Sequence, residues 1–251
     1  MKVVSDLLVK SPVLHITDHI TRARQLLREE GFRELYVTDE KGTLVGYIDI
    51  TDVLRVTDTR SNVTVDGFLK DAPSVSSDAI LEDAAAAIRD AGTDSSAVVG
   101  AKGEFIGSIL LSELFPVLVN RHELQGLVGD VMTRRVVTCA PDDSIQKVYS
   151  LITESGYLAF PVEKDNAVIG IVSRKDFINT GRVRSSISNS ASTSVEIVMT
   201  TPAIVAFKGD SLDDAAKAIV RHDISHLPVI ENDGRIIGII NRQDLLNNLR
   251  I

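Results

Sequence analysis

The sequence predicts an α+β protein built from four similar repeats, each ordered as strand, helix, strand, strand and helix. Three observations predict this fold: an amphipathic helix pattern that recurs about every 60 residues, a glycine in the second strand after each helix, and an acidic residue six positions after that glycine. An internal period of this kind indicates a repeat architecture. One repeat is too small to cover its own sheet, so we expect the repeats to pack as two pairs.

The first helix of each repeat has apolar residues at an anchor position and at three, six and seven positions beyond it. This spacing places one apolar stripe along a helix. The four anchors are Ile20, Leu81, Ile145 and Leu212. Aspartates just before the anchors are interpreted as helix caps; they are Asp18, Asp78, Asp143 and Asp210. Residues that tolerate a left-handed backbone stand eleven positions after the anchors; they are Gly31, Gly92, Gly156 and Asp223.

Two short apolar strands joined by a polar turn follow each helix. The turns at residues 39–42 and 231–234 combine Asp, Glu, Asn and Gly, which are hairpin signals. The glycines of the second strands are Gly46, Gly107, Gly170 and Gly238, and the acids six positions later are Asp52, Glu113, Asp176 and Asp244. An acid in the first turn of a helix also favours the helix dipole. Helix capping is therefore the alternative to ligand binding, and we prefer it for Glu113.

The repeats cover about residues 4–58, 65–120, 126–180 and 193–251. We expect each repeat to open with a strand segment. We expect residues 1–123 to form one module and residues 124–251 a second. A Ser-rich loop over residues 179–194 joins repeats three and four.

Repeats three and four carry the most specific motifs. Residues 129–133 and 196–200 read GDVMT and EIVMT, residues 160–162 and 227–229 read FPV and LPV, and residues 173–176 read SRKD. Together these motifs resemble the CBS domain, the cystathionine β-synthase-type motif, and the resemblance covers nearly the whole chain. It implies two Bateman modules, each a pair of motifs packed through their sheets into a disk. It also implies that clefts between paired motifs bind AMP, ADP, ATP or S-adenosylmethionine.

The resemblance implies nucleotide sites mainly in repeats three and four. Asp176 and Asp244 would each accept hydrogen bonds from ribose hydroxyls, and Ser173 would donate to phosphate. Asn241 replaces that hydroxyl in repeat four and weakens the site. Arg174, Arg242 and His226 are the other candidate phosphate partners. The remaining candidates line or flank the adenine slot: Thr133, Val136, Val137, Ala159, Phe160, Pro161, Thr200, Ala203, Ile204, Leu227 and Pro228.

Repeats one and two are interpreted as degenerate. Asp49 stands where repeat three has its hydroxyl and would repel phosphate, although Asp52 could hold a ribose. Leu110 stands at the same place in repeat two, and Tyr36 and Ala97 replace the proline. Residues 1–123 hold 13 basic and 20 acidic side chains, whereas residues 124–251 hold 14 and 15. The second half therefore repels an anionic nucleotide less.

The composition excludes several classes of protein. The 251 residues are 44% hydrophobic with a net charge of −8, which is typical of a globular chain and disfavours nucleic acid as a partner. The single Cys139 excludes an internal disulfide. No apolar run reaches the length of a membrane helix and no signal peptide is evident, so we expect a cytoplasmic protein with no membrane partner. No catalytic motif or metal-spaced histidine cluster appears, so we expect no enzyme activity, no metal and no required cofactor.

The resemblance to the CBS domain implies a regulatory module that binds an adenosine-containing small molecule and transmits its occupancy to a partner protein that the sequence does not identify. Apolar helix positions such as Leu114, Phe115, Val117 and Leu118 predict that modules pack together, within one chain or as a homodimer. Two alternatives stay open. One is a structural or dimerisation module without a ligand, and the other is nucleic-acid binding through Arg134, Arg135, Arg182 and Arg184.

Overall fold

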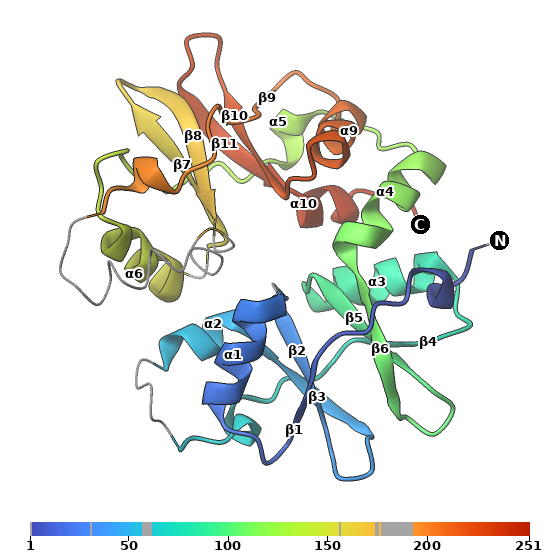
Figure 1. Ribbon diagram of the computed structural model, residues 1–251. Helices are drawn as coiled ribbons and strands as arrows, with labels where there is room; N and C mark the ends of the chain where they lie inside the picture. The colour runs from blue at the N-terminus through green and yellow to red at the C-terminus, as the bar shows by residue number, and fades with distance from the viewer. Residues whose placement is uncertain (1, 31, 57–61, 156, 174–175, 177–192) are drawn as a thin grey trace. The chain divides into compact units, whose positions relative to one another are not determined.

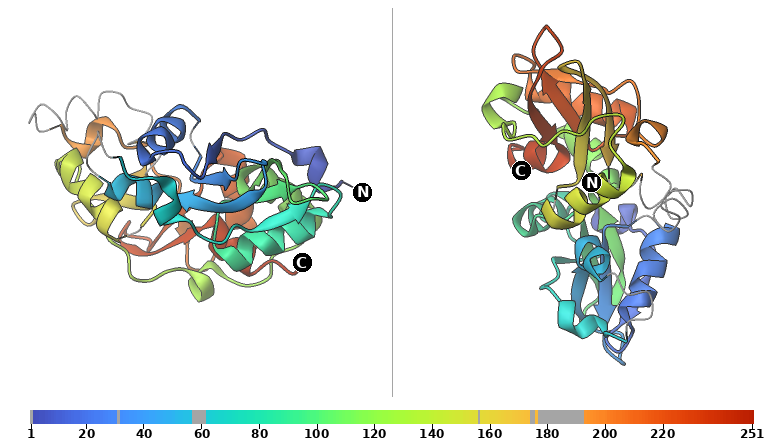
Figure 2. Two further views of the ribbon diagram at one scale, coloured as in Figure 1. Left: turned by 90° about the horizontal axis from the view of Figure 1, so that it is seen from below. Right: turned by 90° about the vertical axis from the view of Figure 1, so that its left-hand side faces the viewer.

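The computed structural model describes residues 2–30, 32–56, 62–155, 157–173, 176 and 193–251. The chain divides into two compact units: unit 1 comprises Met1–His122 with Leu249–Ile251, and unit 2 comprises Glu123–Asn248. Each unit holds two repeats, and the chain can be followed by colour from repeat one in blue to repeat four in red (Figures 1 and 2).

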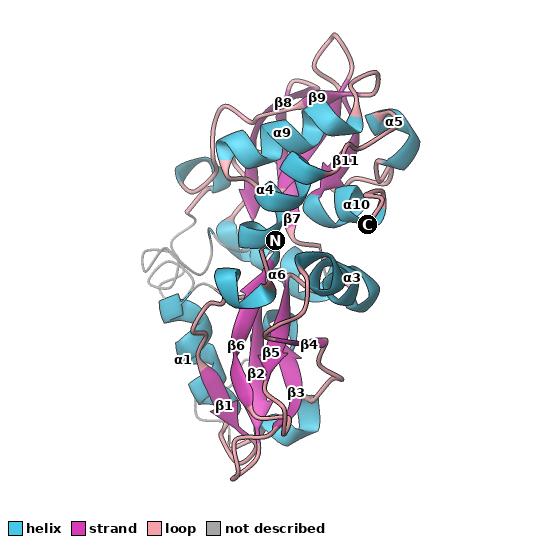
Figure 3. Ribbon diagram, turned by 90° about the vertical axis from the view of Figure 1, so that its right-hand side faces the viewer, coloured by secondary structure: helices cyan, strands magenta, loops and turns pink. Residues whose placement is uncertain are grey.

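Unit 1 contains repeats one and two, each with a three-stranded sheet and two helices. The elements of repeat one are η1 (Val4–Leu7), β1 (Val13–His15), α1 (Ile20–Glu30), β2 (Glu34–Thr38), β3 (Leu44–Asp49) and α2 (Ile50–Arg55). Those of repeat two are η2 (Val65–Phe68), β4 (Ser74–Ser76), α3 (Leu81–Ala91), β5 (Ser95–Val99), β6 (Phe105–Leu110) and α4 (Leu111–Arg121). In each sheet the central strand pairs parallel with the first strand and antiparallel with the third. Helices flank these strands in Figure 3.

Unit 2 repeats this plan with shorter first strands. Repeat three comprises α5 (Val128–Val131), α6 (Ile145–Ser155), β7 (Ala159–Lys164) and β8 (Ala167–Ser173). Repeat four comprises η3 (Val195–Ile197), β9 (Ala206–Phe207), α9 (Leu212–His222), β10 (His226–Ile230), β11 (Ile236–Asn241) and α10 (Arg242–Asn247). The first strand of repeat three is reduced to one bridge between Cys139 and Val162. Most of the segment that follows Ser173, including the predicted Ser-rich loop, lies outside the described residues.

The predicted α+β fold and its helix periodicity are confirmed. All four anchors are buried, with exposed fractions of 0 to 2%: Ile20, Leu81, Ile145 and Leu212. Gly92 and Asp223 end α3 and α9 in the left-handed conformation, at φ 65° and 47°. Gly31 and Gly156 lie outside the described residues.

The expectation that aspartates before the anchors cap the helices is wrong. The Oδ2 atoms of Asp18, Asp143 and Asp210 accept hydrogen bonds from backbone N–H groups three residues earlier in the chain, at 2.8 to 2.9 Å. These carboxylates therefore stabilise the turn that leads into each helix. The cap of α9 is Ser211, whose hydroxyl accepts from the Asp214 N–H at 3.0 Å.

The opening segment of each repeat also differs from the expected strand. Each begins with one helical turn, namely η1, η2, α5 or η3, and reaches its short first strand or bridge only several residues later. We call the stretch between that turn and that strand or bridge the crossing segment, because it passes from one repeat to the other.

The crossing segments exchange reciprocally within each unit. In unit 1, Val9 of repeat one pairs with Ser108 of β6, while Lys70 of repeat two pairs with Tyr47 of β3. Each pair exchanges two backbone hydrogen bonds of 2.8 to 3.0 Å. Each repeat thus supplies backbone partners to the last strand of the other, so a pair of repeats is the structural unit.

The same exchange joins the two repeats of unit 2. Thr133 of repeat three pairs with Ile239 of β11, and Thr200 of repeat four pairs with Ile171 of β8, again through two hydrogen bonds each. The close approach explains the glycine in every second strand. A Cβ on Gly170 would lie 2.8 Å from the Thr200 carbonyl oxygen, and one on Gly46 would lie 2.7 Å from that of Lys70.

We predict that Gly170→Ala lowers the free energy of unfolding by about 1–3 kcal/mol, because the added methyl group forces the crossing segment away from β8. The matched control is Gly209→Ala, since a Cβ on Gly209 has no atom within 4 Å. Urea denaturation of the two variants measures the difference. Equal denaturation midpoints for both variants and the wild type would refute the packing explanation.

Candidate functional site

The candidate site residues of unit 2 gather at two equivalent strand ends. Ala159 and Ser173 are cross-strand partners at one end of the β7–β8 hairpin, and Asp176 stands three positions after Ser173. His226 and Asn241 are partners at the corresponding end of the β10–β11 hairpin. Asp244 then stands in the first turn of α10.

Each crossing segment of unit 2 brings residues of one repeat beside the last strand of the other. Thr133 pairs with Ile239, two residues before Asn241. The chain then passes through Val136 and Val137 to Cys139, which pairs with Val162 of β7. The segments therefore link the two hairpins. The glycine in each second strand was the sequence signal for this exchange. Its physical reason is the close approach of the other repeat's crossing segment, which the sequence alone does not reveal.

The second crossing segment is arranged in the same way. Thr200 pairs with Ile171, two residues before Ser173. The chain continues through Ala203 and Ile204, both partly exposed, to Ala206, which pairs with Val229 of β10. Unit 2 thus contains two half-sites, each made from the crossing segment of one repeat and the strand end of the other.

Asp244 occupies a partly buried position at the start of α10. Its Oδ2 accepts the Asn241 backbone N–H at 2.9 Å, while Asn241 Oδ1 accepts the Asp244 N–H at 2.9 Å. This is a capping box. Burial raises the pKa of Asp244, and the hydrogen bond from Asn241 opposes the shift. The Oδ1 atom makes no hydrogen bond to any described residue, so it can accept one from a ligand.

Ser173 and Asp176 form the equivalent contact in repeat three, with one difference. Asp176 Oδ2 accepts both the Ser173 backbone N–H at 2.7 Å and the Ser173 hydroxyl at 2.8 Å. A hydroxyl has one proton, so Ser173 can donate to a phosphate only if it gives up Asp176. By contrast, the side-chain amide nitrogen of Asn241 makes no hydrogen bond to a described residue.

The candidate phosphate partners have different surroundings. Arg242 Nη2 donates to Asp223 Oδ1 at 3.2 Å, and its Nε is buried with no hydrogen-bond partner among the described residues. His226 Nδ1 lies 2.8 Å from the Ser225 hydroxyl. Arg174 lies outside the described part of the chain. The contact with Asp223 therefore holds the Arg242 side chain at the C-terminal end of α9.

Two candidates for the adenine slot are core residues. Phe160 and Leu227 have exposed fractions of 0%, which differs from the expected lining role. Phe160 packs edge-on against Tyr157 with ring centroids 6.2 Å apart. Pro161 and Pro228 are also buried. These four side chains support the strands and offer little surface to a ligand.

The equivalent positions of unit 1 are filled by its own side chains. Lys70 Nζ lies 2.6 Å from Asp52 Oδ2, so the acid of repeat one already has a cation. Asp49 Oδ1 caps α2 by accepting the Thr51 N–H at 2.6 Å. Glu34, which corresponds to Ala159 and His226, is itself buried at 4% exposed.

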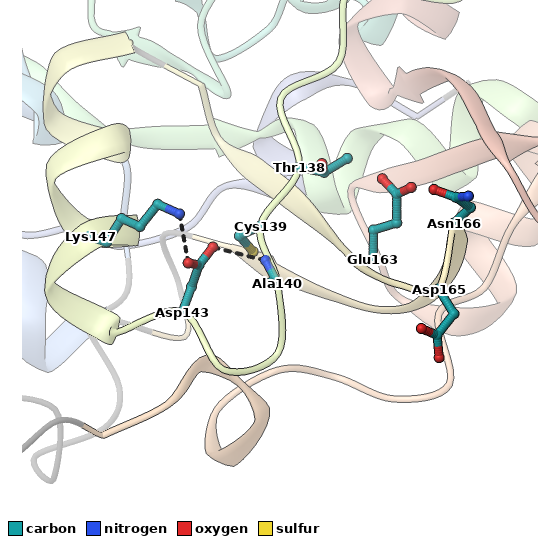
Figure 4. A pocket seen from close by; sticks show the side chains of 8 residues that line it. All are labelled: Thr138, Cys139, Ala140, Asp143, Lys147, Glu163, Asp165 and Asn166. Carbon is teal, nitrogen blue, oxygen red and sulfur yellow. Dashed lines mark hydrogen bonds and ion pairs between the residues drawn. The ribbon is translucent and has the colours of Figure 1, made fainter.

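A hollow of about 390 Å³ in unit 2 begins where the crossing segment of repeat three ends, at Thr138 and Cys139, and none of the candidate site residues lines it (Figure 4). An ion pair between Lys147 and Asp143 borders one side, and Glu163, Asp165 and Asn166 of the β7–β8 hairpin border the other. Cys139 also borders it but is 4% exposed, as expected for a small apolar core residue. Burial and then the charge of Asp143 raise the pKa of its thiol to about 12, so the thiol is unreactive near neutral pH.

Every helix among the described residues is too short or too polar to span a bilayer. No group of three or more His, Cys, Asp and Glu side chains there gathers as a metal site would require.

Comparison with known proteins identifies relatives of this chain. Protein MJ1225 of Methanocaldococcus jannaschii is 28% identical over 161 residues, which is 59% of this chain and 56% of that protein. A homoserine O-acetyltransferase of Methanococcoides burtonii is 33% identical over 119 residues, 47% of this chain but 23% of that enzyme. The chain spans about half or less of the length of the curated relatives it first matches.

Solved structures share the fold of the whole chain. The crystal structure of MJ1225, proposed to be an archaeal homologue of g-AMPK, matches with a TM-score of 0.77 at 21% identity, over 98% of this chain and 99% of that one. An uncharacterised conserved protein from Pyrococcus horikoshii matches with a TM-score of 0.67 at 22% identity, over the same shares.

The sequence profile of the CBS domain matches residues 4–58, 128–181 and 194–251, which is more than half of the chain. Repeat two is outside these matches, yet it has the element order of repeat one. The weak signal has a physical basis, because Leu110 and Ala97 replace the polar and proline positions of the motif. With its paired repeats and reciprocal crossing segments, the chain belongs to the CBS domain family and has the Bateman module fold.

Proposed function

We propose that unit 2 binds an adenosine-containing ligand and that its occupancy regulates a partner protein. The observation that carries this proposal is the pair of equivalent half-sites. In each one, a crossing segment lies beside a strand end that is followed by an acid, as with Thr133 beside Ile239, Asn241 and Asp244. Ligand contacts in such a half-site come from both repeats, so a bound ligand would change how the repeats are held together.

The chemistry of each half-site suits a nucleoside. The Oδ1 atom of Asp244, which makes no hydrogen bond to a described residue, can accept hydrogen bonds from ribose hydroxyls. The partly buried Val136, Val137, Ala203 and Ile204 supply apolar surface for a base. The raised pKa of Asp244 indicates a carboxylate that is poorly solvated, and hydroxyl donors from a ligand would offset that cost.

The half-site of Asn241 and Asp244 has the more available phosphate donor. Ser173 is engaged with Asp176, whereas the Asn241 amide nitrogen has no bond to a described residue. This reverses the order expected from the sequence, in which the hydroxyl of repeat three was the better donor. The choice among AMP, ADP, ATP and S-adenosylmethionine depends on groups beyond the nucleoside.

Unit 1 is proposed not to bind such a ligand. Its acid Asp52 is paired with Lys70, and Glu34 fills the position of Ala159. Family membership supports a regulatory role without catalysis. The regulated protein, self-association and a cytoplasmic location stay predictions, and light scattering of the purified chain tests self-association.

We predict that Asp244→Asn and Asp176→Asn weaken binding of the preferred ligand by about tenfold or more, because an amide accepts fewer hydrogen bonds than a carboxylate and each lost bond costs about 1–3 kcal/mol. Asp52→Asn is the matched control in unit 1 and should leave affinity unchanged. Calorimetric titration with AMP, ATP and S-adenosylmethionine measures the effect. Loss of binding in Asp52→Asn alone would assign the site to unit 1, and no binding to the wild type would favour a structural module.

A second prediction separates ligand binding from helix capping. Asn241→Ala and Ser211→Ala each remove a side-chain cap, from α10 and α9, so both should lower the free energy of unfolding by about 1 kcal/mol. Only Asn241→Ala should also weaken ligand binding, because Ser211 lies outside both half-sites. Thermal denaturation and calorimetry on the same samples check this, and an equal loss of affinity in both variants would mean that stability alone sets the affinity.

A further inference from the structure

Unit 1 contains a buried carboxylic acid between its two repeats. Glu34 begins β2 of repeat one and is 4% exposed. Its Oε1 accepts the backbone N–H of Asp94 at 2.9 Å and its Oε2 accepts the hydroxyl of Ser95 at 2.8 Å. Both partners belong to repeat two, so the carboxyl group joins the start of β2 to the start of β5.

Tyr36 extends this contact into a chain of three oxygen atoms. The Tyr36 hydroxyl lies 2.9 Å from the Ser95 hydroxyl, and Tyr36 is 1% exposed. The tyrosine ring also packs on Phe105 of repeat two, with ring centroids 5.3 Å apart. We call Glu34, Ser95 and Tyr36 the latch. With Glu34 ionised, the protons must point from Tyr36 to Ser95 and from Ser95 to Glu34.

Protonation of Glu34 reverses this chain. A proton on Oε2 donates to Ser95, and the Ser95 hydroxyl then donates to the Tyr36 oxygen. The three oxygen atoms stay adjacent in both states, but in the protonated state the Tyr36 proton must turn away from Ser95. The bonds with Asp94 and Ser95 need no rearrangement of heavy atoms, so the latch can hold the proton without any movement of the strands.

The charges around Glu34 favour the protonated state. The neighbouring groups are Arg33 before β2, Asp49 at the end of β3, Asp94 before β5, and the phenols of Tyr36 and Tyr47. Arg33 Nε lies 3.7 Å from Glu34 Oε1 and 3.4 Å from Asp49 Oδ2, and its Nη1 lies 3.3 Å from Asp94 Oδ2. The guanidinium group of Arg33 is thus shared by three carboxylates, of which Glu34 is the least solvated.

We propose that the latch is a proton-sensitive contact that holds repeats one and two together when Glu34 is protonated and loosens when Glu34 ionises. The ionised carboxylate gains solvation when the latch opens, whereas the protonated acid gains little. In unit 2 the equivalent positions are Ala159 and His226, and neither side chain has a carboxyl group. Unit 1 would then respond to pH, independently of ligand binding in unit 2.

The sign of the effect follows from linkage. Burial, followed by repulsion from Asp94, raises the pKa of Glu34 to about 7, and Arg33 opposes the shift. A raised pKa in the closed state means that the stabilisation is fully present below the ordinary pKa of a glutamate and is lost as the pH rises through about 7. The opening constant should therefore increase between about pH 4.5 and 7 and become constant at higher pH.

Hydrogen exchange of the full chain between pH 5 and 8 tests the proposal, with rates corrected for the intrinsic pH dependence of exchange. We expect protection in residues 34–38 and 95–99 to fall by more than about tenfold from pH 5 to 7. Residues 159–164 in unit 2 are the internal reference, because this strand contains no histidine. Glu34→Gln should remove the pH dependence, and the exposed Glu40→Gln should keep it. A dependence that persists in Glu34→Gln, or that is equal in unit 2, would overturn the proposal.

Two further measurements keep the test decisive if Glu34→Gln does not fold. Carbon-13 NMR of glutamate-labelled wild-type protein should give Glu34 a titration midpoint near neutral pH, assigned by comparison with Glu34→Asp, and a midpoint below 5 would overturn the proposal. Tyr36→Phe removes the last oxygen of the latch but leaves the acid. It should lower protection at every pH while the pH dependence remains, and loss of that dependence would mean that Glu34 is not the titrating group.

Discussion

The fold depends on the reciprocal exchange of crossing segments. The second strand of each hairpin lies at the edge of its sheet, where backbone groups would be unpaired. The crossing segment of the other repeat pairs with part of this edge. The approach is so close that the strand residue beneath must lack a side chain, as at Gly46 and Gly170. A single repeat therefore lacks both its edge cover and its core partner, which is why the repeats occur in pairs.

The exchange also determines where a functional site can form. It brings the opening residues of one repeat beside the hairpin end of the other, so any ligand there contacts both repeats. The two units share this backbone plan but differ at the residues that face it. Unit 2 has Ala159 and His226 at these positions, and unit 1 has Glu34 and Ser95, which bond to each other. The same scaffold can therefore hold a ligand in one unit and an internal contact in the other.

Sequence patterns predicted the elements whose causes are local. The apolar stripe marked by Ile20 and Leu212, and the left-handed helix ends at Gly92 and Asp223, depend on neighbours within a few residues. The helical turns that open each repeat and the role of Asp143 in a turn were missed, because several backbone conformations satisfy the same short sequence. The half-sites and the bond between Ser173 and Asp176 depend on contacts that no local pattern records.

The distribution of charge completes the distinction between the units. Residues 1–123 have seven more acidic than basic side chains, so unit 1 repels an anionic ligand at every distance within the screening length. Inside it, Lys70 neutralises Asp52, and Arg33 is shared by Glu34 and its acidic neighbours. The same excess of carboxylates that disfavours an anionic ligand also makes a buried acid easier to protonate. The proposed lack of nucleotide binding in unit 1 and the proposed titration of Glu34 would thus share one cause, the excess of acidic side chains.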